Sequence, residues 1–146
     1  MTSGDCVLCR RATTLGTAEP GWLLRTTYWG VSMHPAMPVP GWVAVQTLRH
    51  TEGFADLDAA EAIELGLLLS QVSAAVTCVT GSERVYTYSL GEGCPHTHVL
   101  IGPPTQSSRG AAFITRLLRR DQSLADEPTA RRLATELAAE LAGELA

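Results

Sequence analysis

The sequence predicts one α+β domain, in which an antiparallel sheet carries a long helix packed on one side and extra helices follow at the C-terminus. Three observations predict this class. Short segments rich in aromatic and β-branched residues recur between residues 22 and 101. A long apolar segment with helical spacing separates two groups of them, and the C-terminal residues repeat leucine every four positions. With 146 residues, 45% of them hydrophobic, the chain is long enough to bury one core.

Five segments are expected to form the strands of the sheet. They are residues 22–25, 28–33, 42–48, 84–90 and 96–101. Residues 34–40 contain three prolines and are expected to form a constrained loop, and the Gly-Glu-Gly sequence at 91–93 predicts a turn. The pattern assigns no strand or helix before residue 22.

Three segments are expected to be helices. Asp58, with Glu61 three residues later, is typical of a capped N-terminus, and helical spacing continues to about Val79, before Gly81. Residues 110–120 and 128–145 read as amphipathic helices, the second with Pro128 in its first turn. The single domain, residues 1–146, is therefore expected to have a core at about 4–104 and a C-terminal helical extension at about 110–146.

The charge pattern argues against two classes of partner. The net charge of −4 and a pI of about 5.5 do not favour nucleic acid. The N-terminus lacks the apolar core of a signal peptide and no run approaches the length of a membrane span, so we expect a cytoplasmic protein without a membrane partner. All eleven basic residues are arginine. Arg109, Arg116, Arg119 and Arg120 form a basic patch, either a phosphate contact or a solvated helix face.

The cysteines indicate a metal or redox centre near the N-terminus. Cys6 and Cys9 form a Cys-x-x-Cys pair, which in a cytosolic chain favours metal binding or a redox dithiol over a structural disulfide. A redox dithiol would be expected to follow a strand, and nothing before Cys6 is long enough to be one. Zinc needs two further ligands. His50 and His96 are the best candidates.

The stretch Cys-Pro-His-Thr-His-Val-Leu at 94–100 holds half of the chain's histidines. In a strand, the spacing of His96 and His98 would place both rings on one face, where a metal, an anion or a phosphorus centre could meet them. A neutral imidazole can attack phosphorus and form a covalent intermediate. The backbone amides of Gly91 and Gly93 could hold phosphate oxygens.

These residues resemble the histidine triad superfamily. Its signature is three histidines alternating with hydrophobic residues on a strand, preceded in one branch by a glycine-rich turn and proline, as in Gly91–Pro95. Cys6 and Cys9, the sequence from Pro40-Gly41 to Arg49-His50, and the capped helix after Asp58 match the family in order. The resemblance covers about residues 4–104 and implies a homodimeric nucleotide-binding protein.

The resemblance implies a role for each matching residue. In the zinc-bearing branches, which include galactose-1-phosphate uridylyltransferase, two cysteines, a histidine and the first triad histidine bind a structural zinc ion. These ligands would be Cys6, Cys9, His50 and His96. The middle histidine, here His98, becomes nucleotidylated. In an alternative register Cys94 is a zinc ligand and His96 the nucleophile.

Two positions depart from the family. Leu100 stands where the third histidine is expected, and leucine neither donates nor accepts a hydrogen bond. His34 stands where the family's ribose-binding acid is expected, so it is a candidate substrate contact, with a surface histidine as the alternative. We therefore expect a hydrolase or transferase acting on a small-molecule nucleoside phosphate through nucleotidyl-His98. The alternatives are a related enzyme redirected to a specialised biosynthetic reaction and a non-catalytic nucleotide-binding module.

Overall fold

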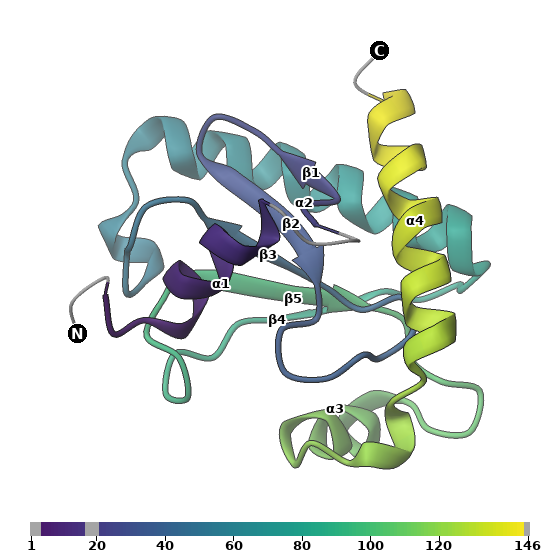
Figure 1. Ribbon diagram of the computed structural model, residues 1–146. Helices are drawn as coiled ribbons and strands as arrows, with labels where there is room; N and C mark the ends of the chain where they lie inside the picture. The colour runs from purple at the N-terminus through teal and green to yellow at the C-terminus, as the bar shows by residue number, and fades with distance from the viewer. Residues whose placement is uncertain (1–3, 17–20, 145–146) are drawn as a thin grey trace.

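The computed structural model describes residues 4–16 and 21–144 and has a five-stranded antiparallel sheet between helices (Figure 1). The strands lie in the order β1-β2-β3-β5-β4. Their bounds are β1 Leu24–Arg25, β2 Trp29–Met33, β3 Val43–Thr47, β4 Tyr86–Tyr88 and β5 His98–Gly102. All five expected strands are present, each shorter than its predicted segment. Strand β5 starts two residues later than predicted, so His96 lies in the turn before it.

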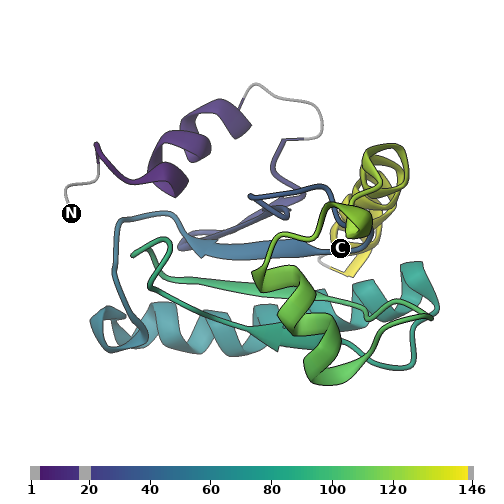
Figure 2. The same ribbon diagram turned by 90° about the horizontal axis from the view of Figure 1, so that it is seen from below.

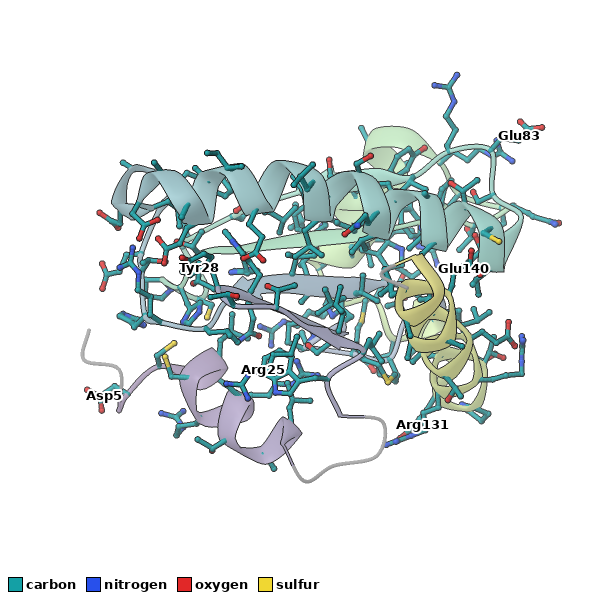
Figure 3. The ribbon with its side chains drawn as sticks, turned by 90° about the horizontal axis from the view of Figure 1, so that it is seen from above. Asp5, Arg25, Tyr28, Glu83, Arg131 and Glu140 are labelled. Atoms are coloured by element: carbon teal, nitrogen blue, oxygen red, sulfur yellow. The ribbon has the colours of Figure 1, made fainter. Side chains whose placement is uncertain are left out.

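The two faces of the sheet carry different helices. Helix α2 (Ala59–Thr80) covers one face and the short α1 (Val7–Leu15) the other, so the sheet is the middle layer of three (Figure 2). The view from above shows the same arrangement, with α4 (Glu127–Glu144) beside one end of α2 (Figure 3). The long helix packs on one side of the sheet as expected, and α1 on the other side is a helix that the sequence analysis missed.

Helix α2 begins and ends at the residues that the sequence predicts. The Asp58 side chain accepts a hydrogen bond from the Glu61 amide at 2.9 Å, and Glu61 accepts one from the Asp58 amide at 2.9 Å. Arg49, in the loop between β3 and α2, holds the Glu61 carboxylate, with 2.6 Å between Nη2 and Oε2. At the other end Gly81 adopts a left-handed conformation with φ of +66°.

The inward face of α2 forms the main core with the sheet. Leu68, Val72 and Val76 are at most 1% exposed and pack with Val99 and Ile101 of β5. Among the described helices α2 alone is long and apolar enough to cross a membrane, a property that the sequence analysis did not expect. Its packing on the sheet explains the apolar inner face, but Ile63 and Leu67 on the outer face remain 69% and 65% exposed.

Alternation along β5 separates the core from the opposite face of the sheet. Val99 and Ile101 point toward α2, whereas Leu100 belongs to a second cluster with Trp42 and Phe113. Helix α4 contributes Leu137 and Leu141 to the main core with α2, whereas Phe113 comes from α3 (Gly110–Leu118), so α3 packs on the face that carries α1. This face holds the residues that the sequence analysis selected for chemistry.

Two glycines of the sheet lie directly beneath indole rings. A Cβ atom on Gly30 would collide with the ring of Trp22, and one on Gly102 would collide with the ring of Trp42. Trp42 is fixed in place, since its Nε1–H donates a 2.8 Å hydrogen bond to the Pro103 carbonyl. Each indole ring therefore packs directly against the strand at a position where only glycine, which has no side chain, leaves room for it.

Candidate active site and metal centre

The four predicted metal ligands lie together although they come from three separate parts of the sequence. The ligand atoms of Cys6, Cys9, His50 and His96 all lie within 4.8 Å of one another. Nδ1 of His96 is 3.3 Å from Sγ of Cys6 and 3.4 Å from Sγ of Cys9, and Nδ1 of His50 is 3.5 Å from Sγ of Cys9. Zinc bound tetrahedrally to cysteine and histidine places neighbouring ligand atoms about 3.5 Å apart. The cluster therefore fits zinc.

Local structure brings each ligand to this cluster. Cys6 is the N-cap residue of α1 and is fully buried, and Cys9 lies in the first turn of the helix. Burial and the neighbouring Cys6 and Cys94 raise the pKa of the Cys9 thiol to about 11, so a cation is needed to favour its thiolate. Cys94 interacts with Cys6 but is not part of the four-residue cluster. The geometry thus favours the register in which His96 is the ligand.

Hydrogen bonds orient His96 toward the cysteines. Its Nε2–H donates to the Thr47 carbonyl at 2.9 Å, which leaves Nδ1 without a proton and free to bind a metal. Thr47, Thr51 and Thr97 join their hydroxyl groups behind the ring, with 3.1 Å and 2.8 Å between successive oxygens. The sequence analysis missed this threonine network, for which the only signal was three threonines next to predicted ligands.

His98 faces away from the cluster and lines a cavity of about 550 Å³. Its Nδ1 lies 2.6 Å from the carbonyl oxygen of His96, so Nδ1 carries the proton and Nε2 carries the lone pair. His34 and Leu100, two of the predicted substrate contacts, line the same cavity, and so does Gly93. Gly91 is exposed and is not among the residues that line it.

His34 is a buried residue of this cavity and not a surface histidine. Its Nδ1 accepts hydrogen bonds from the amides of Ala36 and Met37 at 3.1 and 3.3 Å, so its proton sits on Nε2. Burial lowers the pKa of His34 to about 4, with smaller contributions from Arg11, His98 and Arg120. Nε2 is buried and has no hydrogen-bond partner among the described residues. The ring is therefore neutral and offers a donor where the family has an acid.

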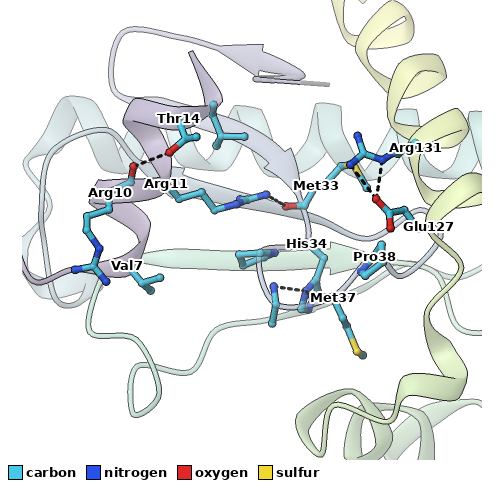
Figure 4. Close-up of a pocket in the computed structure, with 13 residues that line it drawn as sticks. Val7, Arg10, Arg11, Thr14, Met33, His34, Met37, Pro38, Glu127 and Arg131 are labelled. Carbon is cyan, nitrogen blue, oxygen red and sulfur yellow. Dashed lines mark hydrogen bonds and ion pairs between the residues drawn. The ribbon is translucent and has the colours of Figure 1, made fainter. Parts of the chain in front are cut away.

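Arg11 is a cavity residue that the sequence analysis missed. It extends from α1 to the end of β2, where its guanidinium donates to the Met33 carbonyl at 3.0 Å (Figure 4). It also donates to the Ser32 hydroxyl at 2.8 Å. Arg11 and His34 also line a second cavity of about 600 Å³, which adjoins the first and reaches Arg131 of α4 (Figure 4). The position of Arg11 could have been inferred from the sequence only if α1 had been predicted.

Comparison with known proteins identifies the fold. No family model matches the chain, and no curated protein matches its sequence. Solved structures do match. A HIT-like protein from Bartonella henselae has a TM-score of 0.71 at 10% identity, covering 96% of this chain and 99% of its own. A zinc-bound histidine triad family protein from Mycobacterium smegmatis has a TM-score of 0.68 at 14% identity, covering 98% and 99%.

A third match is a diadenosine triphosphate hydrolase from Plasmodium falciparum, with a TM-score of 0.64 at 15% identity, covering 86% of this chain and 78% of that one. At these identities the likeness concerns the fold. The sheet order, the position of α2 and the Cys/His cluster agree with it. This chain has the histidine triad fold.

Proposed function

We propose that the protein is a nucleotide-binding hydrolase or transferase that acts on a nucleoside phosphate through a nucleotidyl intermediate on His98. The observation that carries this proposal is the hydrogen bond between His98 Nδ1 and the His96 carbonyl at 2.6 Å. It leaves the Nε2 lone pair available at the wall of a cavity that also contains Arg11. A nucleophile held in the correct tautomer beside a cation is what attack on an anionic phosphate requires.

The reaction would proceed in two displacements at phosphorus. Nε2 of His98 forms a bond to the phosphorus atom while the bond to the leaving group breaks and its electron pair departs with that group. The His98 ring becomes cationic and shares its Nδ1 proton with the His96 carbonyl. Water or another acceptor then attacks the phosphorus and releases His98. The backbone amide of Gly93, which lines the cavity, is a candidate donor to the phosphate oxygens, whereas Gly91 lies outside the cavity lining.

Zinc is proposed as a structural cofactor. Cys6, Cys9, His50 and His96 would hold it with four protein ligands, which leaves no position for a substrate water. When bound, zinc would cross-link α1 to the loops that carry His50 and His96. His96 then has two tasks, because its ring would bind the metal and its carbonyl orients His98.

We further propose a homodimer in the cytoplasm, with a small-molecule nucleotide as the partner and no nucleic-acid or membrane partner. The outer face of α2 supports the dimer, since Ile63 and Leu67 are exposed on one helical stripe. A second candidate function is a histidine triad enzyme redirected to a specialised biosynthetic reaction. Leu100 favours it, because this residue lines the cavity without a hydrogen-bonding group.

The test uses the intact protein and diadenosine triphosphate. Wild-type protein is quenched in acid-free denaturant during turnover and its mass is measured. We expect an adduct of one adenylyl group, which His98→Ala abolishes without changing the melting temperature. Binding without adduct or product would instead identify a non-catalytic nucleotide-binding module. If several nucleotides neither bind nor react, that result would support the redirected enzyme.

A further inference from the structure

Arg120 has a backbone conformation that arginine rarely adopts. Its φ is +53°, and it is the only non-glycine residue with positive φ in the described segments 4–16 and 21–144. It follows α3, and the amides of Arg120 and Asp121 donate to the carbonyls of Leu117 and Arg116 at 2.9 and 3.0 Å. This is the Schellman arrangement, whose left-handed position is normally glycine because a Cβ is strained there. The fold alone would favour glycine at position 120.

The side chain of Arg120 lines the cavity of His98. Arg11 reaches this cavity from α1, His34 from the loop after β2, and Arg120 from the end of α3. The Arg120 guanidinium has no hydrogen-bond or ion-pair partner among residues 4–16 and 21–144. The buried Nε2–H of His34 also has no partner there. Three groups that can only donate therefore line one cavity, and Glu92, which is exposed, provides the one carboxylate among its lining residues.

The other members of the basic patch do not share this position. Arg116 is paired with Asp121, with 2.8 Å between Nε and Oδ2. Arg119 is exposed, as Arg120 is, but it adopts a right-handed helical conformation and lines none of the described cavities. The sequence left open whether the patch is a phosphate contact or a solvated face. The structure divides it, with Arg120 alone directed to the cavity.

Leu100 determines what kind of leaving group these donors can assist. It cannot protonate a leaving atom, so an amine or alcohol would depart poorly from the phosphorus atom that His98 attacks. A phosphate that leaves from a phosphoanhydride needs no proton, since its bridging oxygen carries the departing electron pair as negative charge. Arginine stabilises such charge through paired N–H donors. The combination of Leu100 and Arg120 thus favours an anionic leaving group over a neutral one.

We propose that Arg120, supplied by the C-terminal extension, binds a phosphate group of the substrate together with Arg11 and Nε2–H of His34. This inference rests on the proposed function for the site but adds a phosphate contact from the end of α3, outside the segment that resembles the family. When the leaving group is a phosphate, the bond between His98 Nε2 and phosphorus forms while the P–O bond to that phosphate breaks. The electron pair remains on the leaving phosphate, which Arg120 contacts.

The test compares Arg120→Gly with Arg119→Ala in the full-length, metal-loaded protein. Glycine relieves the strain at position 120, so we expect the melting temperature of Arg120→Gly to rise by about 3 °C. We expect the same variant to bind inorganic pyrophosphate about ten-fold more weakly in isothermal titration calorimetry. Arg119→Ala should change neither quantity. If Arg120 had only a structural role, its replacement by glycine would not raise the melting temperature and weaken pyrophosphate binding at the same time.

Three outcomes would overturn the inference: no pyrophosphate binding by wild type, unchanged binding by Arg120→Gly, or a lower melting temperature in that variant. His98→Ala keeps the result separate from the proposed function. It should retain pyrophosphate binding, because the three donors remain. If wild type forms no nucleotidyl adduct but its pyrophosphate affinity depends on Arg120, the phosphate site stands and the covalent mechanism fails.

Discussion

The carbonyl oxygen of His96 accepts a 2.6 Å hydrogen bond from Nδ1 of His98, while the His96 ring lies 3.3 Å from the thiol of Cys6. One residue therefore connects the metal cluster to the candidate nucleophile through its ring on one side and its backbone on the other.

Cys6→Ser should lower zinc content and stability together. The protein as purified is expected to hold about one zinc per chain, and a site closed by four ligands contributes to folding. Elemental analysis and thermal unfolding measure the two effects. Cys94→Ser is the matched control, since Cys94 lies beside Cys6 but outside the ligand cluster. Full zinc occupancy in Cys6→Ser would refute the assignment of this residue.

Leu100→Gln should increase turnover of an adenosine phosphoramidate by at least about ten-fold, because the amide can hydrogen-bond the departing amine. Leu100 is 6% exposed, so a polar group there should also cost about 1–3 kcal/mol of stability. Leu117→Gln provides the control, as Leu117 lines the same cavity and is 3% exposed. An equal rate gain in both variants would show that looser packing, and not the new amide, is responsible.

Acid should destabilise the protein through His34. Its pKa is about 4 when folded and 6.5 in the unfolded chain, so between these values the unfolded state binds a proton that the folded state does not. Stability therefore falls as pH decreases from about 7 to about 4, by about 3 kcal/mol for this residue. Denaturant unfolding of wild type and His34→Gln across this range gives the difference. Protonation of the zinc ligands in acid affects both proteins equally. Parallel curves of stability against pH for wild type and His34→Gln would therefore exclude a contribution from His34.

Ile63→Glu and Leu67→Glu should each convert the proposed dimer to monomers, because each places a carboxylate in the middle of the exposed stripe of α2. Sedimentation velocity measures the change. Ala142→Glu on the exposed face of α4 adds the same charge elsewhere and should leave the dimer intact. A wild-type protein that sediments as a monomer at all concentrations would contradict the proposal directly.

The sequence predicted the sheet and α2 because their signals are local. The Asp58–Glu61 capping box, Gly81 and the alternation around Val99 each depend on residues within a few positions. Helix α1 has no such signal, since its N-cap residue Cys6 makes no side-chain cap hydrogen bond and the helix ends in two threonines and a leucine. It is held by tertiary contacts of the buried Leu8 and Leu15, which a sequence does not display.

The candidate site was predicted in part for the same reason. Spacing within Cys6–Cys9 and His96–His98 suggested the ligands and the nucleophile, and the structure places the four ligands in one cluster. Spacing also suggested a strand through His96, but the backbone turns there so that the ring reaches the cysteines. Arg11 and Arg120 come from elements whose packing decides where they point, so the sequence could only suggest a basic patch.

The indole rings that lie over Gly30 and Gly102 constrain how this chain can change over evolutionary time. A larger residue at position 102 becomes acceptable only after Trp42 has been replaced, and removing Trp42 first leaves a void beside the buried Phe113. The two substitutions are thus epistatic, and each single step is disfavoured. Distant relatives too divergent for ordinary sequence searches should retain or lose both members of each tryptophan–glycine pair together.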